Sequence, residues 1–421
     1  MTKDSNDKFE KLNRKALSAA EAQALILQHA SYAAAEELDL IDAIGRRLAD
    51  DIKTREPIPH FRRSGMDGYA VLAEDVADAS SSKPIVLEVA EHIPCGTAPK
   101  KKLVSGQASR IMTGGMVPDG ADTVIMQEAA ELVSINNREY VHIRKSTQLG
   151  SHITPIGEEA ESGQMLLSSG QTIGAGSIAI LASLGYARVK VFTKPKVAII
   201  STGTELLEPS EPLQAGKIRN SNAYMIAAQV IAAGGEPLLI GQISDVYEQA
   251  ETLLYELLNS EVDLIVTTGG VSVGDYDIMA DFFTKWNGTT LFNKIRMRPG
   301  SPTTVGLWNN KLLFGLSGNP SACFVGFELF VRPLLHAMQR EVTPIACEHS
   351  AFLAEDYMKV NAYTRYVRGR WYSENARLYA LPVGLDKSSA MVTLKDANCL
   401  IVIPPTTTGL KAGEQVKIVQ L

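Results

Sequence analysis

The residues of this 421-residue chain most capable of chemistry lie in the segment 267–277, Thr-Thr-Gly-Gly-Val-Ser-Val-Gly-Asp-Tyr-Asp. It follows a short apolar run, 262–266, whose β-branched residues are typical of a buried parallel strand. Backbone N–H groups at such a turn bind anions, and carboxylates such as Asp275 and Asp277 bind divalent cations. The segment therefore indicates a phosphate and a metal held together, although a Gly-Gly turn can also simply connect a strand to a helix.

Polar side chains follow other expected strands of the same region. Glu205, Asp245 and residues 317–319 each come after a short apolar run. The carboxyl ends of parallel strands meet at one edge of a doubly wound sheet, where ligands bind. Glu205 could be an ordinary surface residue and Asp245 a helix cap. Their coincidence at one edge favours Mg²⁺ that bridges phosphate oxygens and is held by three carboxylates of these loops.

A basic stripe occurs shortly after the glycine-rich segment. Alternation over residues 292–298 predicts that Lys294, Arg296 and Arg298 lie on one face of a strand. A solvated sheet edge would carry the same stripe. The functional interpretation is an oxyanion clamp, by which a chain of net charge −6 could bind an acidic ligand.

Several common site classes are missing from the sequence. The chain has no Walker A sequence, and no G-x-G-x-x-G follows a first expected strand, which disfavours ordinary nucleoside triphosphatases and nicotinamide dehydrogenases. The seven histidines include no pair at zinc-ligand spacing. Net negative charge disfavours nucleic acid as a partner. The polar N-terminus, the four scattered cysteines and the lack of an apolar run near 18 residues predict a cytoplasmic protein without a membrane segment.

The elements that must position these residues predict a multidomain α/β plus β fold. A capping-box pattern at Ser18 and Glu21 predicts the start of a first helix. Residues 193–340 alternate strands and helices, which predicts a doubly wound α/β domain. Its helices include one capped by residues 220–222 and one over residues 247–258. Residues 58–150 are rich in short strands and turns and predict an inserted β-rich domain. Residues 1–57 and 151–192 then form a discontinuous mixed domain, and the period-two pattern of 341–421 predicts a small C-terminal β domain resembling a barrel.

Two motifs of the inserted domain have ordinary explanations when taken alone. Asp67-Gly68 is the dipeptide of a hairpin turn, and Thr113-Gly-Gly fits the end of a strand. In order along the chain, the motifs are Ser-Gly-Met-Asp-Gly-Tyr-Ala-Val (64–71), Ile-Met-Thr-Gly-Gly-x-Val-Pro-x-Gly-Ala-Asp (111–122), Ser-Thr-Gly-Thr-Glu-Leu (201–206), Gly-Gly-Val-Ser-Val-Gly-Asp-Tyr-Asp (269–277), Arg-Pro-Gly-Ser-Pro (298–302) and Gly-Asn-Pro (318–320). Together they resemble the molybdopterin molybdenumtransferases, the MoeA family, which is related to the E domain of gephyrin.

The resemblance implies an elongated, four-domain subunit that forms a homodimer. It implies insertion of molybdenum from molybdate into adenylylated molybdopterin, with Mg²⁺-dependent cleavage of the pyrophosphate link and release of AMP. By motif position, the residues implied to be catalytic are Asp67, Thr113, Glu205, Asp277 and Lys294. Those implied to hold the metal are Glu205, Asp245 and Asp277. Those implied to bind substrate are Thr202, Gly269, Gly270, Ser272, Asp275, Arg298, Ser317, Asn319, Arg368 and Ser388. Asp67 and Thr113 would come from the inserted domain of the partner subunit, and an upstream molybdopterin adenylyltransferase would supply the substrate.

The chain departs from the family pattern at several motif positions. Thr204 stands where the family often has Asp, and Ser317 where it often has Pro. Ser301 stands where the family often has Lys, which removes a positive charge from the oxyanion end. Residues 153–156 replace an arginine-rich stretch of many relatives.

Two other functions fit parts of the sequence. A molybdopterin adenylyltransferase shares the α/β domain, but it needs only that single domain. A scaffold of the gephyrin kind would use the fold to bind partners, but it need not keep Glu205, Asp245 and Asp277. Catalysis of molybdenum transfer is therefore the preferred interpretation.

Overall fold

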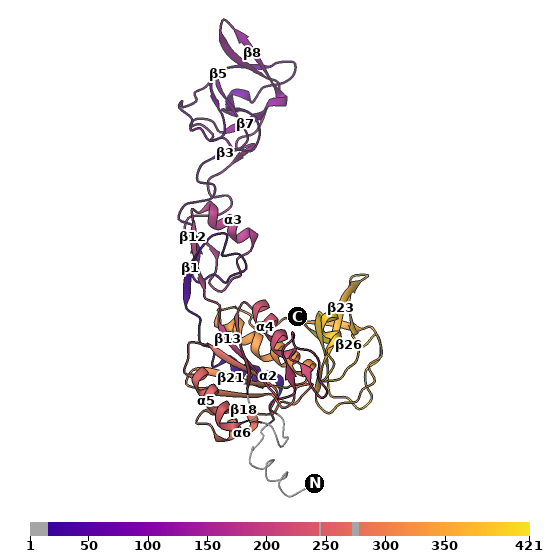
Figure 1. Cartoon of the computed structure of the whole chain (residues 1–421). Helices are drawn as coiled ribbons and strands as arrows, with labels where there is room; N and C mark the ends of the chain where they lie inside the picture. The colour runs from indigo at the N-terminus through magenta and orange to yellow at the C-terminus, as the bar shows by residue number, and fades with distance from the viewer. Residues whose placement is uncertain (1–15, 244–245, 272–277) are drawn as a thin grey trace. The chain divides into compact units, whose positions relative to one another are not determined.

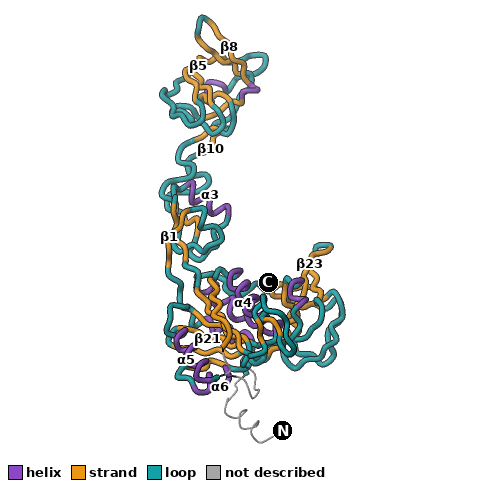
Figure 2. Tube along the Cα trace, viewed as in Figure 1, coloured by secondary structure: helices purple, strands orange, loops and turns teal. Residues whose placement is uncertain are grey.

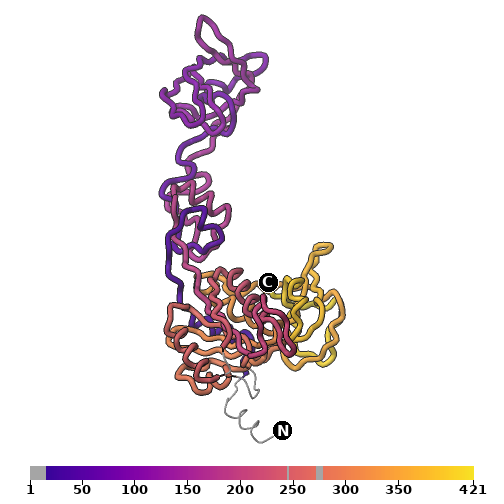
Figure 3. Tube along the Cα trace, in the orientation of Figure 1, coloured from indigo at the N-terminus to yellow at the C-terminus, as the bar shows by residue number. Residues whose placement is uncertain are grey.

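A computed structural model describes residues 16–243, 246–271 and 278–421 of the chain (Figure 1). It divides into two compact units. The first comprises Met1–Asp50, Ser169–Ala179 and Tyr186–Leu421, and the second Asp51–Ser168 and Ile180–Gly185. The chain path in Figure 3 shows that the second unit is an insertion. The four domain boundaries expected from the sequence stay a prediction.

The second unit is built on a six-stranded sheet of order β7-β4-β6-β5-β9-β8. Its strands are β4 (Gly68–Val71), β5 (Ile85–Ile93), β6 (Gln107–Ile111), β7 (Thr123–Met126), β8 (Ala130–Ile135) and β9 (Arg138–Ile143). Two-stranded pairs add β2 (Ile52–Lys53) with β11 (Met165–Leu167), and β3 (Arg63–Ser64) with β10 (Ile153–Thr154). The β-rich insertion predicted from the turn spacing is confirmed.

In the described part of the first unit, the first helix is α2 (Ala19–Leu27), which starts with the predicted capping box. The Glu21 backbone N–H donates to Ser18 Oγ at 3.2 Å, and the Ser18 N–H donates to Glu21 Oε2 at 2.7 Å. These reciprocal bonds satisfy two donors that a helix N-terminus otherwise leaves unpaired. Strand β1 (Ala35–Asp39) then pairs with β12 (Arg188–Phe192) in antiparallel register. Helix α3 (Ala175–Ser183) is divided between the two units after Ala179.

The α/β sheet of this unit has the order β16-β13-β17-β21-β20-β18. Its parallel strands are β13 (Lys196–Thr202), β16 (Glu236–Ile243), β17 (Leu264–Thr268) and β21 (Lys311–Leu316). Strands β20 (Thr304–Trp308) and β18 (Thr289–Phe292) continue it in antiparallel register. Because the chain order reverses beside β13, the carboxyl ends of β13 and β17 form the topological switch point at which such sheets bind ligands.

Both faces of this sheet are buried, which explains the continuous apolar strands. Val197 and Ile199 pack on one face with helices α4 (Asn222–Ala232), α7 (Pro320–Gly326) and α8 (Arg332–Met338). Ala198 and Ile200 pack on the other with α5 (Tyr247–Leu258) and α6 (Ile278–Lys285). Successive strand residues point to opposite faces, so a doubly covered strand must be apolar throughout. Figure 2 shows these helices around the sheet.

The helical stretch Pro320–Met338 combines α7, a π-helical segment Phe327–Val331 and α8. Among the described residues it is long and apolar enough to cross a bilayer, so the expectation that no run approaches this length is wrong. However, 78% of it is buried inside the fold, and its buried Glu328 is paired with Arg332. It is therefore the central core helix of the α/β domain.

The C-terminal domain is a closed β-barrel. Its strands are β22 (Glu348–Leu353), β23 (Thr364–Glu374), β24 (Arg377–Pro382), β25 (Cys399–Ile403) and β26 (Gln415–Gln420). They follow the order β23-β24-β22-β26-β25, and β25 pairs back onto β23 to close the barrel. The two-residue strand β19 (Met297–Arg298), which comes from the α/β domain, pairs with the start of β23. The barrel is thereby joined to the α/β sheet through the backbone.

Candidate functional site

A cavity of about 1160 Å³ lies at the carboxyl ends of β13, β17 and β21. Its walls are the loops that follow these strands, the first residues of α4 and α7, and two segments of the C-terminal barrel. This is the sheet edge where the sequence predicted a site. Among the described residues that line it, the charged ones are Glu205, Arg219, Arg298 and Arg365.

The loop after β13 places Glu205 in the cavity. Gly203 has φ +124°, and a Cβ at this position would lie 2.3 Å from Glu205 Oε2. The Glu205 carboxylate therefore occupies the space that a side chain at 203 would need. The Gln242 amide donates to the Gly203 carbonyl and the Lys217 ammonium to the Thr204 carbonyl, which fixes the loop backbone.

The loop after β17 packs directly against the loop after β13. Gly269 and Gly270 have φ of +97° and +63°, and a Cβ at 269 would lie 2.5 Å from Thr202 Oγ1. The Thr202 hydroxyl donates to the Thr268 carbonyl at 3.3 Å. The Gly-Gly pair is thus required by the close approach of two strand ends.

Asn222, the first residue of α4, links this helix to the ends of β17 and β21. Its Nδ2 donates to Thr268 Oγ1 at 2.9 Å and to the Gly318 carbonyl at 2.8 Å. The predicted cap at 220–222 works through Asn220, whose Oδ1 accepts from the Ala223 N–H at 3.2 Å. The N-cap residue Ser221 makes no capping bond with its side chain, and it lines the cavity.

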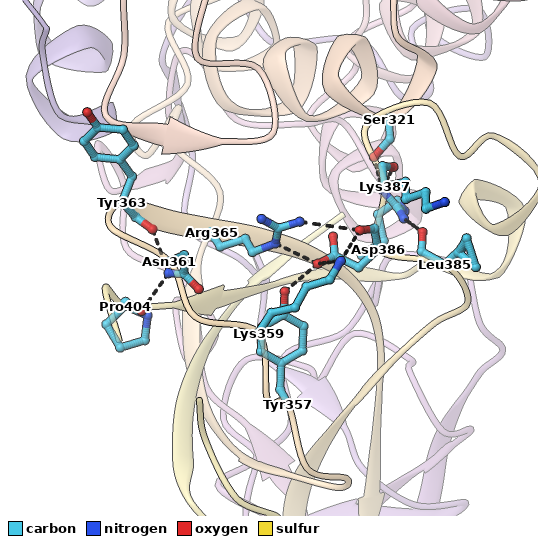
Figure 4. Close-up of polar contacts among 11 residues, drawn as sticks. Ser321, Tyr357, Lys359, Asn361, Tyr363, Arg365, Leu385, Asp386, Lys387 and Pro404 are labelled. Carbon is cyan, nitrogen blue, oxygen red and sulfur yellow. Dashed lines mark hydrogen bonds and ion pairs between the residues drawn. The ribbon is translucent and has the colours of Figure 1, made fainter. Parts of the chain in front are cut away.

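The barrel contributes Arg365 and Ser388 to the cavity wall. Arg365 Nε donates to Asp386 Oδ2 at 2.7 Å, and Asp386 also accepts from the Tyr357 hydroxyl and, at 3.1 Å, from Lys359 (Figure 4). Burial raises the pKa of Asp386, but the hydrogen bonds from Arg365, Tyr357 and Lys359 outweigh it and hold that pKa below its usual value.

Arg368 lies behind this wall and does not line the cavity. Its side chain is 1% exposed, and its guanidinium donates to the carbonyls of Leu385 and Lys387 and to the Ser321 hydroxyl. The Ser321 N–H in turn donates to the Ser388 carbonyl at 3.0 Å. Burial lowers the pKa of Arg368. Arg368 therefore attaches the barrel loop to the start of α7.

Most of the other site residues expected in the α/β and barrel domains meet in the cavity. Those that line it are Thr202, Glu205, Gly269, Gly270, Arg298, Ser317, Asn319 and Ser388. Lys294 does not line it, although the predicted alternation is present, with Ile295 and Met297 buried. Arg296 is bound to Glu21 at 3.1 Å and to the Ala16 carbonyl. Asp245, Ser272, Asp275 and Asp277 lie outside the described residues.

Asp67 and Thr113 belong to the second unit, where they contact each other. Asp67 Oδ1 accepts from the Thr113 N–H at 2.6 Å and from its hydroxyl at 2.7 Å. The backbone bond first, and then the side-chain bond, lower the pKa of Asp67. Asp67-Gly68 is not a hairpin turn, because Gly68 begins β4 and pairs with β6 and β7. A Cβ at Gly68 would lie 1.8 Å from the Ile125 carbonyl oxygen.

Three further residues line the cavity that no sequence motif singles out: Arg219, Asn222 and Arg365. Arg219 Nε and Nη2 donate to the Glu211 carbonyl at 3.3 and 3.1 Å, so the loop itself holds its guanidinium at the cavity. Arg365 reaches the cavity because β23 pairs with β19. The paired residues are 67 positions apart in the chain, so no local sequence pattern predicts this contact. Of the three, only Asn222 belongs to a recognisable local pattern, the polar triplet 220–222. This pattern by itself predicts a helix cap and not a ligand site.

The described residues contain no group of three His, Cys, Asp or Glu side chains suited to a metal. Glu205 is the single described carboxylate that lines the cavity. Mg²⁺ commonly uses one or two protein carboxylates and takes its other ligands from substrate phosphate and water. The Glu205 carboxylate occupies space that is open only because residue 203 is glycine. It fits the role of the single protein carboxylate in such an incomplete Mg²⁺ shell.

Comparisons with known proteins cover nearly the whole chain. The "MoeA N-terminal region (domain I and II)" model matches residues 17–185, the "Probable molybdopterin binding domain" model 198–337, and the "MoeA C-terminal region (domain IV)" model 350–421. A molybdopterin molybdenumtransferase of Bacillus subtilis is 46% identical over 383 residues, 91% of this chain and 89% of the relative. One from Staphylococcus aureus is 39% identical over 95% of this chain and 94% of the relative. The crystal structure of a molybdopterin biosynthesis moea protein from Pyrococcus horikosii has a TM-score of 0.82 and 31% identity, covering 96% of this chain and 99% of that one.

Proposed function

The chain belongs to the MoeA family, and we propose that it is a transferase that inserts molybdenum into molybdopterin. Near full-length similarity to relatives that carry this activity in their names supports the proposal. So does the fold, because the closed barrel and the α/β domain are combined as in the MoeA structure.

The substrate we propose is adenylylated molybdopterin, with molybdate as the second substrate and AMP as a product. The observation that carries this is one cavity of about 1160 Å³ that contains both Glu205 and the guanidinium groups of Arg298 and Arg365. A carboxylate suits a metal, whereas arginines suit oxyanions. The cavity is large enough for a ligand of nucleotide size.

In this proposal Glu205 holds Mg²⁺ together with Asp245 and Asp277. When bound, the cation offsets the negative charge that develops on the pyrophosphate oxygens. Thr202, Ser317 and Asn319 line the cavity and orient phosphate groups through their polar atoms. The N-terminus of the long helix that begins at Pro320 adds a positive electrostatic potential on the same side.

We further propose that the enzyme is a cytoplasmic homodimer that receives its substrate from a molybdopterin adenylyltransferase. Asp67 and Thr113 lie in the second unit and form a preorganised acceptor–donor pair. They would complete the site from the partner subunit.

The decisive experiment measures AMP release from adenylylated molybdopterin in the presence of molybdate, of tungstate and of neither. We expect AMP release that depends on an oxyanion and on Mg²⁺ and that is abolished in Glu205→Ala. Unchanged AMP release in Glu205→Ala would contradict the catalytic assignment. AMP transfer from Mg-ATP to molybdopterin by this chain alone would instead identify an adenylyltransferase, and binding without turnover would identify a scaffold.

A further inference from the structure

Two arginines of the cavity wall are direct neighbours across a strand pair. Strands β19 and β23 are parallel, and their register places Arg298 opposite Arg365. Adjacent strands lie about 4.8 Å apart. Both residues line the cavity. Two positive charges at neighbouring positions repel each other, and an anion held between them would offset that repulsion.

The two guanidinium groups still have hydrogen-bond donors to offer. Arg298 is exposed, and its side chain has no hydrogen bond or ion pair within the described part of the chain. Arg365 uses Nε for Asp386 Oδ2 and Nη2 for the Asp386 carbonyl at 3.4 Å. Its Nη1 group has no partner among the described residues. Guanidinium donors lie in one plane and match the oxygens of a tetrahedral anion.

Asp386 fixes the direction in which Arg365 points. The side chains of Arg365 and Asp386 are 14% and 13% exposed, so the pair is largely shielded from water. Asp386 is itself held by the Tyr357 hydroxyl and by Lys359 (Figure 4). Since one carboxylate serves both Lys359 and Arg365, the local charge stays positive. Asp386 therefore orients Arg365 without cancelling the attraction for an anion.

We propose that Arg298 and Arg365 together bind one tetrahedral oxyanion, and that Asp386 is the positioning residue that sets the geometry of this clamp. Ser301 lines the same cavity but is neutral, and its hydroxyl donates to the Ile295 carbonyl at 2.7 Å. The pairing thus assigns to Arg365 a role in ligand binding that its motif position did not indicate. The proposal rests on the proposed function only for the identity of the anion, either free molybdate or a phosphate of the pterin substrate.

Direct binding to the full-length chain tests the clamp. The dissociation constants of molybdate and of AMP are measured by equilibrium dialysis for wild type, Arg365→Gln, Arg365→Lys and Asp386→Asn. Arg370→Gln is the matched control, because Arg370 lies on the same strand but is exposed and outside the cavity. We expect Arg365→Gln to weaken one of the two ligands by roughly tenfold, since a charge-assisted bond is lost. The Arg370 variant should match wild type.

The ligand that weakens identifies the source of the anion. A loss confined to molybdate assigns the clamp to the free oxyanion, and a loss confined to AMP assigns it to a phosphate. Arg365→Lys should recover only part of the affinity, because an ammonium lacks the planar pair of donors. If the Arg365→Gln variant binds both ligands as tightly as the Arg370→Gln variant does, the proposal is overturned.

Asp386→Asn separates positioning from charge. Removing a carboxylate makes the cavity more positive, so electrostatics alone would tighten anion binding. We expect the opposite, a several-fold weaker affinity and a raised KM with little change in kcat. Tighter binding in Asp386→Asn would refute the positioning role, and thermal unfolding of each variant confirms that it is folded. If the wild-type protein binds the anion as expected but releases no AMP, this inference stands and only the proposed function is refuted.

Discussion

Gly203 is the residue on which the acidic part of the site depends. Any side chain there would meet the Glu205 carboxylate at 2.3 Å and would have to adopt φ +124°. We therefore expect Gly203→Ala to displace Glu205 and to lower kcat/KM by at least about tenfold, the cost of misplacing a group that contacts the reacting atoms.

Gly413→Ala is the matched control for this change. Gly413 also has a positive φ, +85°, but a Cβ there meets nothing within 4 Å. The Gly413→Ala variant should lose about 1 kcal/mol of stability through backbone strain and keep full activity. If the two substitutions lower kcat/KM equally, backbone strain and not the displacement of Glu205 causes the loss of activity.

Asp386 should make stability depend on pH. Its folded-state pKa is lowered, so the charged form is favoured in the native protein. This stabilisation is fully present above the unfolded-state pKa, near 3.9, and is lost as the pH falls through the lowered native value. Asp386→Asn should reduce the free energy of unfolding by about 1–3 kcal/mol at pH 7. Urea unfolding between pH 6 and pH 3 should show the difference from wild type shrinking at the acid end; a constant difference would contradict this.

At the scale of elements, the helices and parallel strands of the α/β domain were predictable because their signals are local. The apolar periodicity of α5 gave Tyr247–Leu258 without error, and the Ser18–Glu21 capping box located the start of α2. The antiparallel strands β18 and β20 are not predicted from the sequence, because pairing direction depends on partners distant in sequence. By motif position Lys294 is implied to be catalytic and Arg368 to bind substrate, but neither lines the cavity, whereas the pairing of β19 with β23 brings Arg365 to its wall.

The first turn of α4 should govern the shape of the cavity. Asn222 is the hydrogen-bond donor that joins the ends of β17 and β21 through Thr268 and Gly318. Asn222→Ala removes both bonds and leaves buried acceptors unpaired, which should cost about 1–3 kcal/mol and raise KM. Asn259→Ala, at the exposed end of α5, removes one bond to Tyr255 and should cost less. Equal unfolding midpoints for the two variants would contradict this role.

At the scale of the whole molecule, the residues of the proposed site are divided between the two units. Asp67 and Thr113 lie in the second, and the cavity lies in the first. If the site is completed across a dimer, Asp67→Ala and Glu205→Ala subunits should complement each other. Mixing the two inactive proteins under conditions that allow subunits to exchange should restore part of the AMP release. No recovery, with mixed dimers verified by differently tagged subunits, would place all site residues within one chain.

The pairing of β19 with β23 limits how this protein can be divided or recombined. The barrel appears separable in sequence, because it begins after the core helix ends at Met338. Yet two residues from the α/β domain hydrogen-bond to its longest strand. A chimera that takes its barrel from a relative must match the segment around Arg298 as well, since a mismatch there would unpair backbone groups and alter the anion contacts together. Natural variation in oxyanion preference within such proteins is therefore expected to involve coordinated change at two places far apart in the gene.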